Sequence, residues 1–384
     1  MKVTVSVFGR FWAFYLAQEL QKRNSLHTLI STYPKFAIKK YDINSDLIRS
    51  VWGVELMSRW WQKLPNWIKG TYNPQLEFLE RFDRGVINSL SPGFDIFVGW
   101  SGACFWSLHR AKEMGALTVL DRGSSHMQYQ TQILQEEYER WGQKFTATHP
   151  GVYERELQSY IDADRIAVPS LFVKRTFLEL GLPENKLIHV PYGVSLKEFY
   201  PVPKEDRTFR IIHCGGISLR KGVQYLLQAF HELNLPDAEL WLVGTLDPAF
   251  QPFLAKYESA RIILKGKQPQ SQLRWFYSQC SVFCLASIEE GLAMVQPQAM
   301  ASGLPVIHTT NTGGEDIVRD GVDGFCVPIR DVEALKEKIL FFYENPERRD
   351  EMGNNALGQA RKSLSWEDYG EKIVSAYQVL LTAK

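Results

Sequence analysis

The chain has 384 residues, about twice the usual size of a single domain, which predicts two domains of about 150–200 residues each. Its 45% hydrophobic and 23% charged residues are ordinary for a folded globular protein and exclude an intrinsically disordered chain. The 44 basic and 43 acidic residues leave a net charge of +1, which argues against nucleic acid as a partner, because nucleic-acid-binding domains carry a strongly basic face.

Short apolar runs alternate with helix-length segments along almost the whole chain. The first run follows Met1 and is interpreted as a β-strand, not a signal peptide, because it is short and alternates with polar residues. In the first half we expect strands at residues 2–7, 26–31, 95–100, 116–120, 165–168 and 186–190. In the second half we expect them at 210–214, 239–243, 261–264, 281–285, 305–309 and 324–328. Buried strands separated by helices predict an α/β protein with two parallel sheets.

The clearest domain boundary is the segment 199–208, which contains two prolines and mixed charge. We therefore predict an N-terminal domain over residues 1–200 and a C-terminal domain over residues 201–364. Ligands of open parallel sheets bind beyond the carboxyl ends of the strands. Two such sheets predict a ligand cleft between the domains.

The cysteines and the apolar runs indicate the cellular compartment in which the protein is expected. Five cysteines lie in apolar runs, which predicts buried free thiols in a reducing compartment: Cys104, Cys214, Cys280, Cys284 and Cys326. Cys280 and Cys284 lack the second pair that a zinc site needs. No run approaches the roughly 18–20 apolar residues of a membrane span. We expect a cytoplasmic protein, at most peripheral at the inner membrane face.

Four tryptophans, Trp52, Trp60, Trp61 and Trp67, lie among basic residues in the segment 51–70. Aromatic and basic side chains at helical spacing suit a membrane interface or a lipid-linked acceptor. The alternative is a helix that packs an aromatic stripe on the first sheet. The sequence leaves both interpretations open.

The segment 287–306, SIEEGLAMVQPQAMASGLPV, is the most informative part of the chain. It follows a buried strand, passes an acidic pair and a glycine, and then begins a helix. The free N–H groups and positive dipole end of such a helix suit a diphosphate. A second glycine-containing turn, residues 309–315, follows the next strand. The two turns could converge on one anionic ligand.

The pattern SxxEGLxxxQxQAMASGLPVI, followed by TGGEDIVRDGVDGFCVP, resembles the C-terminal signature of the retaining GT-B glycosyltransferases of family 4, also called glycosyl transferases group 1. The resemblance extends over residues 163–194, 213–230 and 366–381, and is weaker over residues 1–150. It implies a GT-B fold, in which two Rossmann-like parallel-sheet domains face each other across a cleft. The first domain would lie on the acceptor side, the second would hold the nucleotide sugar, and a final helix, residues 365–384, would cross back to the first.

The resemblance implies a retaining hexosyltransferase-type enzyme that needs no metal or other cofactor. It would move a sugar from a UDP-, GDP- or ADP-sugar to a glycan, lipid-linked or small-molecule acceptor. The acceptor hydroxyl would attack from the face of the leaving phosphate, whose oxygen takes the proton. Two alternatives stay open: a nucleotide-sugar-binding subunit that has lost catalysis, and a sugar-nucleotide epimerase on the same fold.

The resemblance assigns most donor contacts to the second domain. Lys221 matches a lysine that binds the donor phosphate and offsets the charge of the leaving nucleotide. The arginine that the family places five residues earlier is replaced by Gly216, and Arg220 is a candidate substitute. Without the resemblance, Arg220 and Lys221 could be a solvated turn.

Glu290 matches the first glutamate of the family's paired-glutamate motif, which contacts the donor sugar. The second glutamate is replaced by Gln298, whose amide can still bond ribose hydroxyls but without the charge of a carboxylate. The remaining donor contacts implied by the resemblance are Gly266, Lys267, Gly291, Leu292, Ala293 and Met294.

In the first domain, a polar turn follows the strand at residues 116–120: Asp121, Arg122, Ser124, Ser125 and His126. In the family a histidine in the corresponding loop lies beside the sugar, so His126 joins Lys221 and Glu290 as a candidate catalytic residue. Asp121 and Arg122 could instead form an ion pair that stabilises the turn. Gly9 and Arg10 resemble the loop that closes over the donor.

Overall fold

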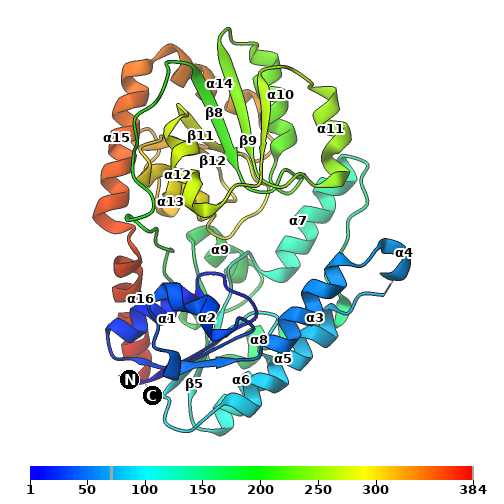
Figure 1. Ribbon diagram of the computed structural model, residues 1–384, viewed down its shortest axis with the longest axis vertical. Coiled ribbons are helices and arrows are strands. Elements are labelled where there is room, and N and C mark those ends of the chain that lie inside the picture. The colour runs from blue at the N-terminus through cyan, green and yellow to red at the C-terminus, as the bar shows by residue number, and fades with distance from the viewer. Residues whose placement is uncertain (70–71, 383–384) are drawn as a thin grey trace.

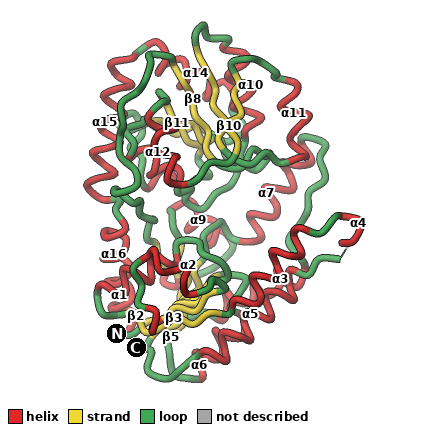
Figure 2. Tube along the Cα trace, viewed as in Figure 1, coloured by secondary structure: helices red, strands yellow, loops and turns green. Residues whose placement is uncertain are grey.

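The computed structural model describes residues 1–69 and 72–382 of the chain. Figure 1 shows two lobes, one above the other, with both chain ends in the lower lobe. Figure 2 shows strands at the centre of each lobe and helices around them. The predicted pair of Rossmann-like parallel-sheet domains is confirmed.

The first lobe is built on a seven-stranded sheet in the order β3-β2-β1-β4-β5-β6-β7, and every neighbouring pair is parallel. The strands are β1 (Val3–Val7), β2 (Leu26–Ser31), β3 (Ile48–Ser50), β4 (Ile96–Trp100), β5 (Leu117–Asp121), β6 (Arg165–Val168) and β7 (Leu187–His189). All residues of β1 and β4 are buried, as expected for central strands covered on both faces. Only β3 was not predicted, because a three-residue edge strand carries too short a pattern.

Helices cover both faces of this sheet. They are α1 (Ala13–Lys22), α2 (Lys35–Ile38), α3 (Trp52–Lys63), α4 (Asn66–Lys69), α5 (Gln75–Ser89), α6 (Phe105–Glu113), α7 (Met127–Arg140), α8 (Pro150–Asp162) and α9 (Leu171–Glu179). Short 3-10 helices are η1 (Lys39–Tyr41), η2 (Ser45–Leu47) and η3 (Glu184–Lys186). Helices α5, α6, α8 and α9 share one apolar core with the sheet, and α1 packs on the opposite face.

The second lobe has a six-stranded parallel sheet in the order β10-β9-β8-β11-β12-β13. Its strands are β8 (Phe209–Cys214), β9 (Ala238–Val243), β10 (Ile262–Gly266), β11 (Val282–Leu285), β12 (Val306–Thr309) and β13 (Gly324–Val327). Its helices are α10 (Val223–Leu233), α11 (Gln251–Lys256), α12 (Gln270–Ser278), α13 (Val295–Ala301), α14 (Val332–Glu344) and α15 (Pro346–Ser363), with η4 (Pro248–Phe250) and η5 (Gly314–Asp316).

The last helix, α16 (Trp366–Thr382), returns to the first lobe and packs against α1 (Figure 1). The rings of Tyr15 and Trp366 stack with their centroids 4.2 Å apart. Gly370 lies so close to α1 that a Cβ would meet Glu19 Cβ at 2.6 Å. This contact places the end of the chain beside its beginning.

Helix α7 belongs to the first lobe in sequence but packs into the second lobe. Ile133 and Leu134 are buried in the apolar core that contains α10 and α14. Glu137, fully buried, accepts hydrogen bonds from Gln224 Nε2 and the Tyr225 hydroxyl, both over 2.8 Å. Its other oxygen pairs with Arg330 Nε over 2.6 Å. A boundary at residue 200 therefore leaves one helix of the first segment in the core of the second.

Helices α3 and α4 project from the first lobe (Figure 1). Trp52, Trp60 and Trp67 are 55%, 65% and 83% exposed, so three of the four tryptophans do not pack on the sheet. Trp61 meets the ring of Tyr72 edge to face. Gly70, the end of the predicted aromatic segment, lies outside the described residues.

The structure also bears on the predictions about free thiols and membrane spans. Each of the five cysteines is a free thiol, and four are buried: Cys104, Cys214, Cys280 and Cys284. Over residues 1–69 and 72–382, no helix is long and apolar enough to cross a membrane.

Candidate functional site

Two cavities open between the lobes, where loops at the carboxyl ends of both sheets meet. The outer cavity, about 1080 Å³, is lined by Arg10 of the first lobe and by Lys267 and Gln298 of the second. The inner cavity, about 450 Å³, is lined mainly by first-lobe residues and by Arg220 of the second lobe. The structure thus brings four of the predicted donor residues to the cleft.

Lys221 and Glu290 form an ion pair between Nζ and Oε1, and Arg220, the neighbour of Lys221, lines the inner cavity. Lys221 lies on the turn between β8 and α10, and Glu290 on the turn between β11 and α13. Gly222 has a φ of +62°, and a Cβ there would meet the Ala286 carbonyl oxygen at 1.8 Å. Glycine therefore lets the lysine turn lie against the end of β11. Two predicted residues, 69 positions apart, are brought together.

Arg220 extends this cluster toward the first lobe. Its Nε lies 3.8 Å from Glu290 Oε1 and its Nη2 lies 3.0 Å from Glu289 Oε2. Burial opposes the charge of Arg220, but Glu290 and Glu289 outweigh burial and raise the pKa of the guanidinium. An ammonium and a guanidinium side by side can bind the oxygens of a phosphate group.

Glu289 is the residue of this cluster that the sequence did not single out. It is fully buried, and its Oε1 accepts hydrogen bonds from the backbone N and the hydroxyl of Ser125 over 3.0 and 2.7 Å. Gln130 Nε2 donates to its Oε2 over 2.8 Å. Burial alone would raise the pKa of Glu289, but Arg220 and these hydrogen bonds lower it. Glu289 thus joins the arginine of one lobe to a loop of the other.

The turn after Glu290 is the point of closest approach between the lobes. A Cβ on Gly291 would lie 1.9 Å from the Gly123 carbonyl oxygen, so only glycine fits. The Ser170 hydroxyl donates to the Gly291 carbonyl over 2.7 Å. Leu292 and Ala293, the next two residues of the turn, are also buried.

The backbone amides of this turn differ in their partners. Glu290 N donates to the Asn311 carbonyl over 2.9 Å and Ala293 N to the Thr312 carbonyl over 3.5 Å. Within the described part of the chain, the amides of Gly291 and Leu292 have no hydrogen-bond partner. Met294 then precedes α13, which has seven residues. Two unpaired amides beside Lys221 form an anion-compatible turn.

Gln298 and Lys267 lie at the outer cavity. Gln298 sits in α13, 8% exposed, and its Oε1 accepts a hydrogen bond from the Tyr277 hydroxyl over 3.3 Å. Its amide nitrogen stays available to a ligand. Gly266 ends β10 with a φ of +65° and turns the chain toward Lys267. Gly216 is exposed, with open space where a side chain would begin.

His126 lies away from this cluster. It is 4% exposed and caps α7, where its Nδ1 accepts a hydrogen bond from Gln128 N over 3.2 Å. Its ring packs on Tyr160 and Phe177, with centroids 4.8 and 5.0 Å away. Burial, with the charge of Arg122, lowers the pKa of His126 to about 4. This placement favours a capping and packing role, and the catalytic role stays a prediction that the geometry does not support.

Asp121 and Arg122 do not form the ion pair considered from the sequence. The Arg122 guanidinium donates to the Ser125 carbonyl over 2.8 Å and pairs with Glu156 over 3.2 Å. Asp121, 3% exposed, instead accepts a hydrogen bond from Trp12 Nε1 over 3.2 Å. It is the last residue of β5 and lines the inner cavity.

Gly9 and Arg10 form the turn between β1 and α1. Gly9 has a φ of +97°, and its N–H and carbonyl are held by the hydroxyls of Thr32 and Ser31 over 3.0 and 2.9 Å. Phe11 follows with a φ of +40°, an uncommon conformation for a residue with a side chain. This turn presents Arg10 to the outer cavity and Phe11 to the inner one.

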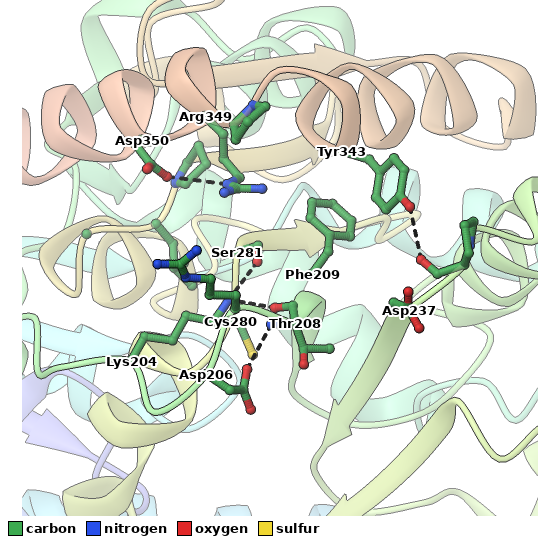
Figure 3. A pocket seen from close by; sticks show the side chains of 16 residues that line it. Lys204, Asp206, Thr208, Phe209, Asp237, Cys280, Ser281, Tyr343, Arg349 and Asp350 are labelled. Carbon is green, nitrogen blue, oxygen red and sulfur yellow. Dashed lines mark hydrogen bonds and ion pairs between the residues drawn. The ribbon is translucent and has the colours of Figure 1, made fainter.

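A third cavity, about 940 Å³, lies beside the amino end of the second sheet (Figure 3). Two of the three cations that line it have partners: Lys204 Nζ donates to the Thr208 carbonyl over 2.7 Å and to the Ser281 hydroxyl over 3.0 Å, and Arg349 Nε lies 3.4 Å from Asp350. None of the predicted site residues lines it. It therefore does not belong to the candidate site.

A comparison with known protein families finds a match that lies mainly in the second lobe. Residues 196–359 match the family model described as Glycosyl transferases group 1. The chain is 28% identical over 248 residues to the GDP-mannose-dependent monoacylated alpha-(1-6)-phosphatidylinositol monomannoside mannosyltransferase of Corynebacterium glutamicum, covering 56% of this chain and 62% of that protein. The chain spans about three fifths of the length of the curated relatives it matches.

Solved structures match over the whole chain. Sucrose-phosphate synthase from Thermosynechococcus elongatus superposes with a TM-score of 0.75 at 18% identity and covers 100% of both chains. Anabaena HepE in complex with UDP-glucose gives a TM-score of 0.70 at 14% identity, over 99% of this chain and 100% of that one. At such identities the likeness shows the fold. Together the comparisons show a segment similar to glycosyl transferases group 1 in the second lobe and the GT-B fold over the whole chain.

Proposed function

We propose that this chain, with its glycosyl transferases group 1 segment and GT-B fold, is a retaining glycosyltransferase of family 4 that uses a nucleotide sugar and needs no metal. The observation that carries the proposal is the cluster of Lys221, Arg220 and Glu290 beside two unpaired backbone amides. Departure of a nucleoside diphosphate leaves negative charge on the phosphate. Fixed positive groups at that place lower the barrier because they need no reorganisation.

Each group of residues along the cleft would contact a different part of the substrates. Lys221, Arg220 and the amides of Gly291 and Leu292 would hold the diphosphate, so that no metal is needed to balance its charge. Glu290, freed from Lys221 by the incoming phosphate, would contact the sugar. Gln298 would bond the ribose in the outer cavity, where Lys267 and Arg10 lie near the base and phosphate. The acceptor hydroxyl would attack from the first-lobe side, and its proton would pass to the departing phosphate oxygen.

The donor and acceptor are proposed as classes. UDP- and GDP-sugars are favoured because the printed names of similar proteins contain UDP-glucose and GDP-mannose. A glycan or lipid-linked acceptor is favoured for the same reason, since one relative acts on a phosphatidylinositol mannoside. The subunit without catalysis and the epimerase remain the alternatives: the first would bind nucleotide without turnover, and the second would isomerise the donor without an acceptor.

Nucleotide binding is the first expected result. In a thermal-shift panel of UDP, GDP, ADP and their sugar conjugates, we expect one nucleotide family to raise the Tm. A ligand at about 100 times its Kd adds about 2.7 kcal/mol of stability, which is easily measured. The shift should persist with a chelator, because the charge of Lys221 replaces a metal. No shift with any nucleotide would contradict the proposal, and a shift abolished by the chelator would contradict metal independence.

We also propose that the arm formed by α3 and α4 touches the cytoplasmic surface of a membrane. Large apolar side chains on it are exposed, above all Trp60 and Trp67. Three cations, Arg59, Lys63 and Lys69, accompany them, against the single acid Glu55 within α3 and α4. Aromatic side chains with a cationic rim suit the interface of anionic lipids.

Flotation with vesicles of anionic lipid tests this contact. We expect wild type to float and Trp60→Ala/Trp67→Ala to stay in solution, because the change removes the two most exposed rings of the arm. Trp275→Ala is the matched control: this tryptophan is 37% exposed on the second lobe. Wild type that stays in solution, or a double variant that floats equally well, would contradict the membrane contact.

A further inference from the structure

The inner cavity combines aromatic walls with one buried carboxyl group. Its walls include Phe8, Phe11, Trp12 and Trp100. Asp121 lines it from the end of β5, and Arg220 lines it from the second lobe. Because Arg220 Nε is 3.8 Å from Glu290 Oε1, the cavity adjoins the cluster proposed to hold the donor. A group bound here would lie on the acceptor side of that cluster.

Asp121 lacks a cation. Its one hydrogen bond comes from Trp12 Nε1, and in the part of the chain that the structure describes no Lys, Arg or His nitrogen lies within 4.0 Å of its carboxylate. The neighbouring Arg122 points its guanidinium at Glu156 and the Ser125 carbonyl. A buried carboxylate without a partner is costly. Burial accordingly raises the pKa of Asp121 to about 7.

Trp100 is the neighbour of Asp121 in the sheet, since the two residues pair in the register of β4 and β5. It is 5% exposed, and its Nε1 is a buried donor without a hydrogen-bond partner. Buried polar groups nearly always have partners. Two adjacent strands therefore end in a carboxyl acceptor and an aromatic ring that line one cavity, while the indole N–H itself is buried.

A hydroxyl group donates a hydrogen bond, so an alcohol bound in this cavity can satisfy the Asp121 carboxylate. The flat aromatic walls suit the apolar face of a sugar ring. We propose that the inner cavity binds a carbohydrate part of the acceptor, and that Asp121 accepts a hydrogen bond from its attacking hydroxyl. This inference rests on the proposed function and assigns to Asp121 the place beside the sugar that the resemblance implied for His126.

Binding of simple sugars to the full chain tests the proposal. The probes are the methyl glycosides of glucose, galactose, mannose and N-acetylglucosamine, added to protein with 15N-labelled tryptophan. Trp100→Phe assigns the Nε1–H resonance of Trp100. We expect at least one glycoside to shift this resonance, and Asp121→Asn to weaken that binding by about 10- to 100-fold, the range for a hydrogen bond to a charged group.

The controls separate this inference from the proposed function. Asp46→Asn, the same change at an exposed site of the first lobe, should bind glycosides like wild type. Asp121→Asn should keep nucleotide binding within about twofold of wild type, because most proposed donor contacts lie in the second lobe and Asp121 does not line the outer cavity. Equal glycoside binding by wild type and Asp121→Asn, or no shift of Trp100 with any of the four glycosides, would overturn the inference. Failure of wild type to bind any nucleotide would overturn the proposed function instead.

The pH dependence of stability checks that Asp121→Asn folds. The raised pKa means that the folded chain holds the Asp121 proton more tightly than the unfolded chain between about pH 4 and 7. This group therefore lowers wild-type stability as pH rises through that window. Arg122 and Arg220 stay charged, and Glu156 is paired with Arg122. Four further neighbours have raised pKa values and stay neutral: Cys104, Tyr192, Tyr369 and Tyr377.

We expect the Tm of Asp121→Asn, relative to wild type, to rise between about pH 5 and pH 8, because the amide carries no charge to bury. This rise in relative Tm is expected if the Asp121 carboxyl is placed for ligand binding, since its buried charge then lowers the stability of the fold. A variant less stable than wild type at both pH values would mean that Asp121 supports the fold, and would overturn the inference.

Discussion

Lys221→Ala should lower the rate of nucleotide release from the donor by about 10²- to 10³-fold, the range for removal of one group that stabilises transition-state charge. The Lys221 ammonium forms an ion pair with Glu290, and the next two residues, Gly291 and Leu292, have unpaired backbone amides. An alanine leaves the departing phosphate with Arg220 as the one remaining cation of this cluster, beside the two backbone amides. The rate is measured by 31P NMR with the donor found in the thermal-shift panel.

The control for this change is Lys336→Ala on α14, a lysine that pairs with Glu232 and Glu333 outside both interlobe cavities. It should turn over the donor like wild type. If Lys221→Ala keeps its fold and releases nucleotide within about threefold of the wild-type rate, Lys221 does not hold the leaving phosphate.

The second large effect is on stability. Glu289→Gln should lower the free energy of unfolding by about 2–4 kcal/mol, because an amide weakens the charge-assisted bonds that the buried carboxylate accepts from Arg220, Ser125 and Gln130. The carboxylate is fully buried and joins Arg220 to Ser125 and Gln130 of the other lobe. We expect the thermal midpoint to fall by roughly 10 °C at neutral pH. Differential scanning calorimetry measures the change.

Glu315→Gln is the matched control, because Glu315 also pairs across the lobes but near solvent. Its partner Arg175 has a side chain 48% exposed, and that of Glu315 is 33% exposed. Exposed pairs contribute up to about 1 kcal/mol, so this variant should melt close to wild type. Equal melting of the two variants would show that Glu289 is not the main polar link between the lobes.

Most of the fold could be predicted because buried parallel strands are continuous apolar runs. Twelve of the observed strands lie where these runs are, while β3, a three-residue edge strand, has no comparable pattern. The packing of α7 into the second lobe was not predictable. Ile133 and Leu134 show only that the helix has an apolar face, and the sequence does not say which sheet covers it.

The candidate site was predictable where a motif fixes both residue type and backbone. Lys221 and Glu290 belong to glycine turns at strand ends, and the structure brings them together. Glu289 was missed because its meaning depends on Ser125, 164 residues earlier. His126 was predicted from the histidine that the family has in the corresponding loop, yet the ring of His126 caps α7 and packs in the core. Asp121, five residues earlier at the end of β5, lines the cavity, and this becomes visible only in the folded structure.

The central claim is that the chain transfers a sugar from a nucleotide donor through the Lys221 cluster. The most direct measurement is 31P NMR of the wild-type protein with UDP- and GDP-sugars, a chelator and the glycoside acceptors. The account predicts appearance of the nucleoside diphosphate together with a new glycoside, at a rate that Lys221→Ala nearly abolishes. A donor that binds but stays intact, or is isomerised without loss of the nucleotide, would contradict it.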